Sequence, residues 1–276
     1  MLPDAAARSV QQYLRLADRL LPGVITGFYV TGSVALGAYR SGRSDIDFVA
    51  VLDGDPGPSG VSRLRLLHGI STSSTGWAAL RGGRSVFSGT CNGVFIRSDQ
   101  LRRPASTIVP VASHCGVGFS AGRDSGVNPV DWKVLAEHGV AVRGPVPESL
   151  GLLPEPERLE LWNRDNLESY WRPLAAWLLT ARHAGGMRFR PRWFTAWGVL
   201  GPPRLHHTIA TGDVISKEAA GEYALDVFGG EWHPIIREGL GYWRGRPGDP
   251  AFRDIRTRAR RTAEFILHTI DSAEEL

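Results

Sequence analysis

The sequence predicts a two-part protein, in which a layer of strands and helices of the α/β or α+β class precedes an all-helical bundle. In the first half, short apolar runs typical of strands alternate with segments of helical periodicity. Beyond Gly144 the strand-like runs stop. Four prolines cluster at the junction, as in a linker: Pro145, Pro147, Pro154 and Pro156. We therefore expect one domain over residues 1–147 and a second over residues 155–276.

The first domain is expected to open with an amphipathic helix that leads into a strand. Apolar residues recur at roughly helical spacing from Val10 to Leu21, and the Pro-Gly pair that follows ends the helix. The run Ile25–Val30 predicts a short strand. After a Gly/Ser turn, a short helix is expected over Val34–Tyr39.

A second strand is predicted over Ile46–Leu52, which is almost wholly apolar apart from Asp47. Such a run is typical of a central strand that is buried on both faces. Asn128 is expected to cap a helix that has proline in its first turn. The remaining elements expected of this domain are a helix over Val61–Leu80, one or two strands within Ser85–Arg97, a strand over Ile108–Phe119, the capped helix Pro129–His138 and a closing strand Val140–Val142.

The second half is expected to be helical throughout. Five segments have helical patterns: residues 157–183, 193–211, 216–228, 232–244 and 250–273. Ser216 is the expected cap of the third segment, ahead of Lys217. Six aromatic residues are expected mainly in the core of this bundle, although some could instead line a binding pocket: Trp162, Tyr170, Trp171, Trp177, Trp193 and Trp197.

The composition is that of a soluble globular protein, with 42% hydrophobic residues. The formal net charge is +4, and the basic residues are nearly all arginine and scattered, which suits an anionic substrate but makes nucleic acid an unlikely partner. Cys91 and Cys115 stand in no disulfide or metal-ligand spacing. There is no membrane-spanning apolar run and no signal sequence, so we expect a cytoplasmic protein.

Two short patterns in the first half indicate phosphate and metal chemistry. Gly32 and Ser33 lie at the predicted strand-to-helix turn, where glycine permits close approach, the hydroxyl donates to phosphate and the helix N-terminus favours an anion. Asp45 and Asp47 lie two residues apart on a strand, so their carboxylates point to one face at a separation of about 7 Å. Carboxylates placed in this way can share a hard cation such as Mg²⁺.

Each pattern alone has an ordinary structural explanation. A Gly-Ser turn is nearly always only a turn, and a pair of aspartates at a strand end is more often solvated than metal-bound. Their combination is different, because Asp47 places a charge in an otherwise apolar strand without compensation unless it is paired or binds a metal. The combination favours a site for a magnesium nucleotide, and hence nucleotidyl transfer.

The same two stretches carry a family resemblance: Thr31-Gly32-Ser33-Val34-Ala35-Leu36-Gly37 and Ser44-Asp45-Ile46-Asp47-Phe48. Together they resemble the signature of the DNA polymerase β-like nucleotidyltransferase superfamily. The resemblance implies an α+β fold, with a small mixed sheet and flanking helices in a nucleotidyltransferase domain over residues 1–147. It also implies that Gly32, Ser33 and Ser44 contact the nucleotide, while Asp45 and Asp47 bind Mg²⁺ and act in catalysis.

Stretches of the second half narrow the resemblance: Pro203-Arg204-Leu205, residues 210–220, Trp232-His233-Pro234 and Phe265-Ile266-Leu267-His268. They resemble the helical C-terminal domain of the streptomycin/spectinomycin adenylyltransferases, which implies such a domain over residues 155–276. The resemblance implies that Arg204 and Lys217 hold ATP, and that Trp243 or, with one gap, Tyr242 stacks near the nucleotide. Without the resemblance, Lys217 is an ordinary first-turn residue after a Ser cap.

The chain departs from the family pattern at the carboxylate that acts as general base. Residues 85–98 contain no Asp or Glu, and the aligned position holds Asn92. An amide accepts a hydrogen bond or ligates Mg²⁺ weakly, but it does not take up a proton near neutral pH. Either the base comes from elsewhere, or the acceptor needs none, or the protein transfers slowly or not at all. The other candidates for the base are Asp99, Asp131 and Glu137.

The activity that the resemblance implies is transfer of AMP from Mg-ATP to a hydroxyl of a small molecule, first of all an aminoglycoside-type antibiotic held between the two domains of a monomer. The alternative is a nucleotide-binding homologue with weak or no transferase activity, because Asn92 replaces the base. Drug-modifying relatives have an acidic residue where residues 192–197 have none here. A cleft without carboxylates binds a polycation poorly. Three nearby acids could compensate: Glu160, Asp165 and Glu168.

Overall fold

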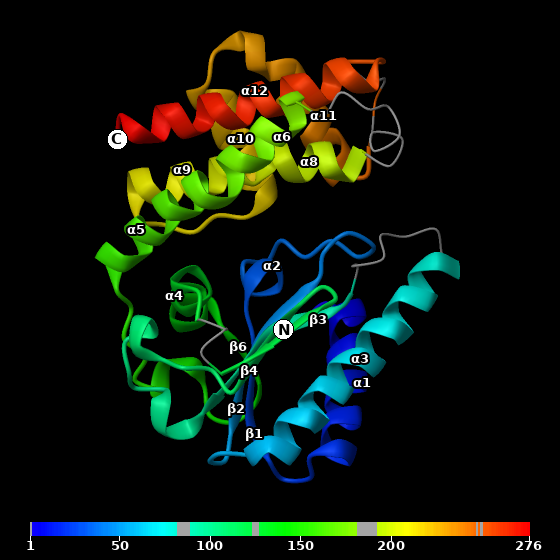
Figure 1. Cartoon of the computed structure of the whole chain (residues 1–276), viewed down its shortest axis with the longest axis vertical. Coiled ribbons are helices and arrows are strands. Elements are labelled where there is room, and N and C mark those ends of the chain that lie inside the picture. The colour runs from blue at the N-terminus through cyan, green and yellow to red at the C-terminus, as the bar shows by residue number, and fades with distance from the viewer. Residues whose placement is uncertain (1, 82–88, 123–126, 181–191, 247, 249–250) are drawn as a thin grey trace. The chain divides into compact units, whose positions relative to one another are not determined.

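The computed structural model describes residues 2–81, 89–122, 127–180, 192–246, 248 and 251–276, with the backbone alone for residues 74–81 (Figure 1). The chain divides into two compact units, Met1–Glu155 and Pro156–Leu276. None of the helices within the described ranges combines the length and the apolar character needed to cross a bilayer.

Unit 1, as far as it is described, consists of a six-stranded sheet and the helices that cover it. Its helices and strands are α1 (Asp4–Leu20), β1 (Ile25–Val30), α2 (Gly32–Ala35), β2 (Ile46–Leu52), α3 (Gly57–Arg81), β3 (Cys91–Arg97), β4 (Ala112–Cys115), β5 (Gly118–Ala121), α4 (Pro129–His138) and β6 (Val140–Arg143), with short 3₁₀ turns at Ser98–Gln100, Ala105–Thr107 and Pro147–Ser149. The strand order is β5-β4-β3-β2-β1-β6. The β2–β3 pair is parallel and the other pairs are antiparallel. The expected mixed sheet is therefore confirmed.

The apolar sequence of β2 accounts for its place in the middle of the sheet. Every residue of the strand except Asp47 is buried, and successive side chains alternate between the two faces. On one face Phe48 packs with Tyr13 of α1 and the buried leucines of α3. On the other face Val49 belongs to a cluster with Trp132 of α4. Figure 1 shows α1 and α3 on one side of the sheet and α4 on the other. Asp47 alternates with Phe48 along the strand, so it faces the α4 side.

Two predicted details of unit 1 differ in the structure, and part of a third lies outside the described residues. The short helix covers Gly32–Ala35 rather than Val34–Tyr39, because Gly37 follows with a left-handed φ of +66°. The strand expected over Ile108–Phe119 is a hairpin of β4 and β5, which turns at Gly116 with a φ of +57°. Residues 85–88 of the predicted third strand region lie outside the described residues.

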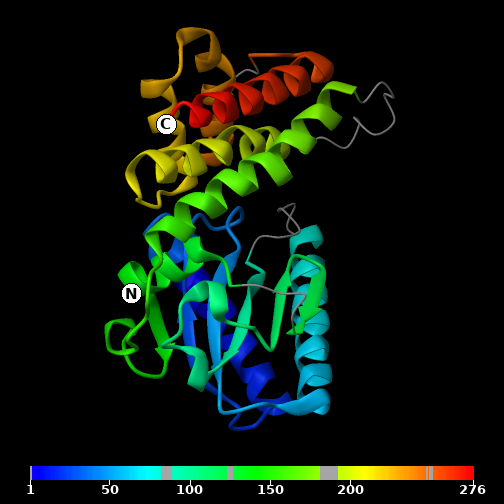
Figure 2. The same ribbon diagram turned by 60° about the vertical axis from the view of Figure 1, so that its left-hand side comes forward.

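Unit 2 is helical throughout its described part. Its helices are α5 (Pro156–Asn166), the π-helical turn η5 (Leu167–Trp171), α6 (Arg172–Thr180), α8 (Arg192–Leu200), α9 (Pro202–Thr211), α10 (Lys217–Val227), the 3₁₀ turn η6 (Gly230–Trp232), α11 (His233–Trp243) and α12 (Ile255–Glu274). The segment expected as one helix over 193–211 breaks at Gly201, before two prolines. The long helix α12, red in Figure 2, packs against α6, α8 and α9.

Both predicted helix caps form. The Oδ1 atom of Asn128 accepts a hydrogen bond from Val130 N at 2.8 Å, and Ser216 Oγ accepts one from Ala219 N at 3.2 Å. These bonds satisfy amide groups that a helix leaves unpaired in its first turn. They fix the starts of α4 and α10, the helices that carry Asp131 and Lys217.

The aromatic residues of unit 2 divide between core and surface. Trp171 is buried, but Tyr170, Trp177 and Trp193 are 49%, 52% and 39% exposed. The expectation that the aromatics mainly form the bundle core is therefore wrong for these three.

Candidate active site

Asp45 and Asp47 lie at the start of β2, and both are partly buried. Asp47 is the register partner of Asn92 on the parallel strand β3, so the two side chains leave the sheet on the same face. The Nδ2 atom of Asn92 donates a hydrogen bond to Asp45 Oδ2 at 2.8 Å. The structure thus brings these three sequence-predicted residues together at one end of the two central strands.

Both ends of the Asn92 amide are hydrogen-bonded. While Nδ2 donates to Asp45, Oδ1 accepts a hydrogen bond from Gly116 N at 3.0 Å. The side chain is buried, with 6% exposure. Asn92 therefore links Asp45 to the β4–β5 turn.

Gly32 lies directly against Asp47. Its φ is +57°, and a Cβ atom on it would stand 2.0 Å from Asp47 Oδ2. The neighbouring Thr31 N donates a hydrogen bond to Asp47 O at 2.9 Å. The close approach expected at this glycine is therefore an approach to the Asp47 carboxylate, and a residue with a side chain has no room there.

The two predicted serines have different surroundings. Ser33 Oγ is buried and has no hydrogen-bond partner within the described part of the chain. A buried hydroxyl left in this state costs about 1–3 kcal/mol, so a phosphate oxygen that accepts from it would be stabilised. Ser44 is only 2% exposed, and its Oγ accepts a hydrogen bond from Arg40 N at 3.0 Å. Ser44 therefore closes the turn that leads into Asp45.

The carboxylates give this end of the sheet a negative electrostatic potential. Burial, and then the charges of Asp47 and Asp45, raise the pKa of the Cys91 thiol to about 12. Burial, and then the charges of Asp45, Asp47 and Asp131, also raise the pKa of Cys115. Both shifts favour the protonated thiol, which is the form that is not nucleophilic. The same field attracts cations.

The donor set at this site fits a magnesium ion that arrives with its nucleotide. No group of three or more His, Cys, Asp or Glu side chains suited to a metal occurs among the described residues. Mg²⁺ commonly binds through one or two carboxylates and completes its shell with substrate phosphates and water. Asp45 and Asp47 supply two such carboxylates beside the Gly32–Ser33 turn.

The three alternative candidates for a general base differ in their surroundings. Asp99 follows the far end of β3, where it pairs with Arg97 at 3.0 Å. Glu137 pairs with Lys133 one turn away on α4. Asp131 lies in the first turn of α4, and its charge reaches the same thiol as those of the two aspartates of β2. Of the three candidates, Asp131 is therefore favoured, because its charge acts on Cys115 together with the charges of Asp45 and Asp47.

The predicted residues of unit 2 gather at the start of α10. Lys217 Nζ lies 4.9 Å from the ring centroid of Trp243, which is buried at the end of α11. Arg204 Nε donates a hydrogen bond to Ile215 O at 3.0 Å, and so ties α9 to the loop before Lys217. Tyr242 is half-buried. The Trp243 ring, one of the two aromatic candidates, faces the Lys217 ammonium.

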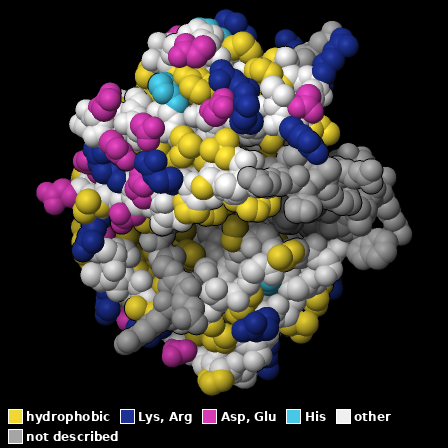
Figure 3. Space-filling model, turned by 45° about the horizontal axis from the view of Figure 1, so that its top comes forward, with side chains coloured by type: hydrophobic (Ala, Val, Ile, Leu, Met, Phe, Trp, Pro, Cys, Tyr) yellow, Lys and Arg dark blue, Asp and Glu magenta, His cyan; other side chains and the backbone are white. Residues whose placement is uncertain are grey.

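Two of the acids expected to compensate for the missing carboxylate are ion-paired. Glu160 pairs with Arg164 at 2.9 Å, and Glu168 pairs with Arg172 at 2.6 Å. On the face that Figure 3 presents, acidic and basic side chains are intermingled. Such exposed pairs add little stability. Their arginines nevertheless neutralise the negative charges of Glu160 and Glu168, which a polycationic ligand would need.

A buried polar cluster in unit 1 has no counterpart in the sequence analysis. Tyr13 Oη lies 2.9 Å from His114 Nε2, and the rings of His114 and His68 are 4.3 Å apart between centroids. Burial, and then the charge of His68, lower the pKa of His114 to about 3. The cluster packs on the α1/α3 side of the sheet, opposite the carboxylates. No local pattern signals it, because its members come from three separate elements.

Comparison with known proteins finds a matching domain family and a similar fold. Residues 10–71 match the nucleotidyltransferase domain family. The crystal structure of spectinomycin adenyltransferase AAD(9) from Enterococcus faecialis, with ATP and spectinomycin, is similar with a TM-score of 0.64 and 13% identity, over 96% of this chain and 99% of that chain. No curated protein matches the chain in sequence. The chain therefore contains a nucleotidyltransferase domain, and its α+β fold is that of this adenyltransferase structure.

Proposed function

We propose that the protein is a Mg-ATP-dependent nucleotidyltransferase that transfers AMP to a hydroxyl of a small molecule, with an aminoglycoside-type antibiotic as the first candidate acceptor. One juxtaposition carries the proposal. Two carboxylates, Asp45 and Asp47, share a face of the sheet beside a glycine turn whose next residue, Ser33, has a buried hydroxyl without a partner in the described residues. This is the donor and ligand set that a magnesium nucleotide requires.

In unit 1 each residue has a separate task in this proposal. Asp45 and Asp47 would hold Mg²⁺, which when bound supplies charge neutralisation at the phosphoryl group under attack. Ser33 Oγ donates to a phosphate oxygen and so gains the partner that it lacks. Asn92 keeps Asp45 in place through its 2.8 Å hydrogen bond, which makes it a positioning residue.

The helical unit contributes Arg204 and Lys217 to nucleotide binding in the same proposal. An ammonium group is a compact charge that binds phosphate well. Trp243 supports the Lys217 ammonium at 4.9 Å, a distance at which a cation is attracted to an aromatic face. The Arg204 contact with Ile215 O holds the loop from which Lys217 extends.

We assign the general-base role to Asp131. A base has to take up a proton from the acceptor hydroxyl, which an imidazole or a carboxylate does most often, and the Asn92 amide does not take one up. Asp131 is held in the first turn of α4, a helix whose start is fixed by the Asn128 cap. Asp99 and Glu137 are less suitable, because Asp99 follows the far end of β3 and Glu137 lies in the last turn of α4.

The acceptor class rests on the likeness in fold to an adenyltransferase crystallised with spectinomycin. Within that class, an acceptor of low positive charge suits this chain better than a polycation. Glu160 and Glu168 already have arginine partners, and residues 192–197 contain no acid.

A second candidate function is nucleotide binding with weak or no transfer. The Asn92 amide favours it, because a side chain with both ends hydrogen-bonded neither takes up a proton nor approaches the substrate freely. The two candidates share the binding step and differ in whether Asp131 supplies the missing base.

Calorimetry with ATP and Mg²⁺ tests the shared step. We expect wild type to bind and Asp47→Asn to lose most of the affinity, while Asp53→Asn, the same change at an exposed site just after β2, retains it. Absence of binding by wild type refutes both functions, and unchanged binding by Asp47→Asn refutes the metal assignment. Pyrophosphate release in the presence of spectinomycin or streptomycin then separates the two candidates.

A further inference from the structure

In unit 2, two consecutive residues at the end of α11 contact two consecutive residues at the start of α10. Trp243, the last residue of α11, faces the ammonium of Lys217, with 4.9 Å between Nζ and the ring centroid. The next residue, Arg244, donates a hydrogen bond from Nε to Oε1 of Glu218 at 2.8 Å. The surroundings of Lys217 therefore depend on α11 as well as on its own helix.

Arg244 also reaches a second carboxylate of α10. Its Nη2 atom donates to Oε1 of Glu222, which lies one helical turn beyond Glu218. Like charges four residues apart on a helix are neighbours and destabilise it. The guanidinium bridges the two carboxylates and offsets their repulsion. The hydrogen bonds with Glu218 and then Glu222 raise the pKa of Arg244 in return.

Close packing of the two helices allows Arg244 to reach both acids. Gly221 lies between the acids in the sequence of α10, and a Cβ atom on it would collide with Cδ2 of Leu240. Arg244 N donates a hydrogen bond to Leu240 O at 2.8 Å, so the two residues are one helical turn apart on the same side of α11. The close approach at the glycine therefore brings the acids of α10 within reach of the guanidinium.

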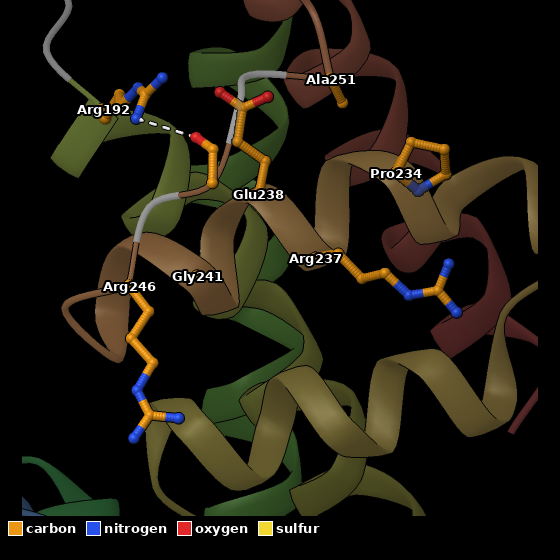
Figure 4. Close-up of a pocket in the computed structure, with 8 residues that line it drawn as sticks. Arg192, Pro234, Arg237, Glu238, Gly241, Arg246 and Ala251 are labelled. Atoms are coloured by element: carbon orange, nitrogen blue, oxygen red, sulfur yellow. Dashed lines mark hydrogen bonds between the residues drawn. The ribbon is translucent and has the colours of Figure 1, made fainter.

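The next arginine along the chain belongs to a different surface of α11. Arg246 lines a pocket together with Pro234, Glu238 and Gly241 (Figure 4). As far as the structure describes this pocket, its lining includes neither Arg244 nor a residue of α10. The acids next to Lys217 are paired with Arg244 instead.

The charges of this group balance only when Arg244 is included. Lys217 and Arg244 carry two positive charges, and Glu218 and Glu222 carry two negative charges. Without Arg244, one positive charge would stand against two negative charges, next to the ammonium that is proposed to meet the phosphates of ATP. Excess negative charge repels a triphosphate and weakens its attraction to Lys217. The ion pairs themselves are partly exposed and contribute little to stability.

We propose that Arg244 is a positioning residue for ATP binding, which neutralises Glu218 and Glu222 so that the charge of Lys217 acts on the phosphates. This inference rests on the proposed function, in which Lys217 binds ATP. Arg244 itself does not contact the nucleotide in this proposal. Its effect is electrostatic, so removal of the two carboxylate charges should compensate for removal of the guanidinium.

Three variants of the whole protein test the neutralisation by calorimetry with ATP and Mg²⁺. Arg244→Gln should weaken ATP binding about fivefold, the size expected for one like-charge contact in water. Adding Glu218→Gln and Glu222→Gln to this variant should restore the affinity of wild type. Arg260→Gln, which breaks another exposed ion pair with a glutamate, on α12, should leave the affinity unchanged.

A double variant that keeps Arg244 separates neutralisation from a purely structural role. Glu218→Gln with Glu222→Gln should bind ATP more tightly than wild type, because two negative charges are removed near the phosphates. If Arg244 served only to hold α10 in place, the same change would break its contacts and weaken binding. Should Arg244→Gln fail to fold by circular dichroism, this double variant decides the outcome, and weaker or unchanged binding overturns the inference.

Salt and Lys217 complete the test. The loss in Arg244→Gln should fall below about twofold at an ionic strength of about 1 M, where the Debye length is about 3 Å. Unchanged affinity of Arg244→Gln, or no recovery in the triple variant, overturns the inference. Absence of ATP binding by wild type, or unchanged binding by Lys217→Gln, refutes the proposed role of Lys217 as well. A loss in Lys217→Gln without one in Arg244→Gln refutes this inference alone.

Discussion

Replacing Gly32 with alanine probes the contact between the glycine turn and Asp47. The substitution adds one methyl group at a position where φ is +57°, and it places that carbon 2.0 Å from Asp47 Oδ2. Two separate costs follow. One is backbone strain, which lowers stability, and the other is a collision, which displaces the carboxylate.

The two costs can be estimated separately. A non-glycine residue in the left-handed region loses about 1–2 kcal/mol of the free energy of unfolding. Non-bonded heavy atoms are in contact near about 3.5 Å, so Oδ2 has to move by more than about 1 Å. A misplacement of about 1 Å can lower a rate by about 100-fold. We therefore expect a marginally less stable protein that binds Mg-ATP at least about tenfold more weakly and transfers almost nothing.

Gly37→Ala is the matched control. Gly37 also has a left-handed φ, +66°, but nothing lies within 4 Å of the position of its added carbon. Urea denaturation should show similar losses of stability for the two variants. Calorimetry with ATP and Mg²⁺ should separate them, with binding retained by Gly37→Ala alone. If Gly32→Ala binds Mg-ATP as well as Gly37→Ala does, Asp47 has no part in nucleotide or metal binding.

Three further outcomes follow from the structure. Lys217→Gln should weaken ATP about tenfold, as expected for loss of one charge that contacts phosphate. The chain's other lysine is the control, so Lys133→Gln should leave affinity unchanged by calorimetry. Asp131→Asn should lower the rate of pyrophosphate release at least about 100-fold with ATP affinity retained, whereas Glu137→Gln on the same helix should leave the rate intact. For His114, burial lowers the folded-state pKa to about 3, below the unfolded value of about 6.5. The neutral buried imidazole therefore contributes its full stability above about pH 6.5. As the pH falls, the unfolded chain takes up the proton first, and the free energy of unfolding drops by about 2 kcal/mol at pH 5. Urea titrations at pH 7.5 and pH 5 should show this loss in wild type and a smaller one in His114→Gln.

The central strands could be predicted closely from the sequence. The apolar runs Ile25–Val30 and Ile46–Leu52 are the strands β1 and β2, because a strand buried on both faces has few polar interruptions. The ends of α2 and the β4–β5 hairpin could not be predicted as well. They depend on left-handed φ angles at Gly37 and Gly116, and a glycine in a sequence does not reveal which of its many conformations it adopts.

In the site, too, the features that follow from a local pattern could be predicted, and those that depend on tertiary pairing could not. The spacing of Asp45 and Asp47 predicts their common face. The hydrogen bond from Asn92 to Asp45 depends on the pairing of β2 with β3, which no local pattern encodes. The surface positions of Trp177 and Trp193 likewise depend on which helix faces find a partner in the bundle, and aromatic content alone cannot decide this.

In the proposed site, Asn92 supports nucleotide binding by holding Asp45 through a hydrogen bond, but proton transfer has to be carried out by another residue. A carboxylate at position 92 would face Asp45 across the 2.8 Å that the amide now bridges as a donor, and two like charges at that distance repel each other. It would also have to keep the Gly116 N hydrogen bond that holds the β4–β5 turn. The amide avoids the repulsion and fixes Asp45, but it does not take up the proton. A base that replaces it therefore has to come from another element, and α4 with Asp131 is the element whose charge reaches the same end of the sheet. It follows that restoring a carboxylate at position 92 would disturb the two aspartates that are proposed to bind the metal, while adding a base.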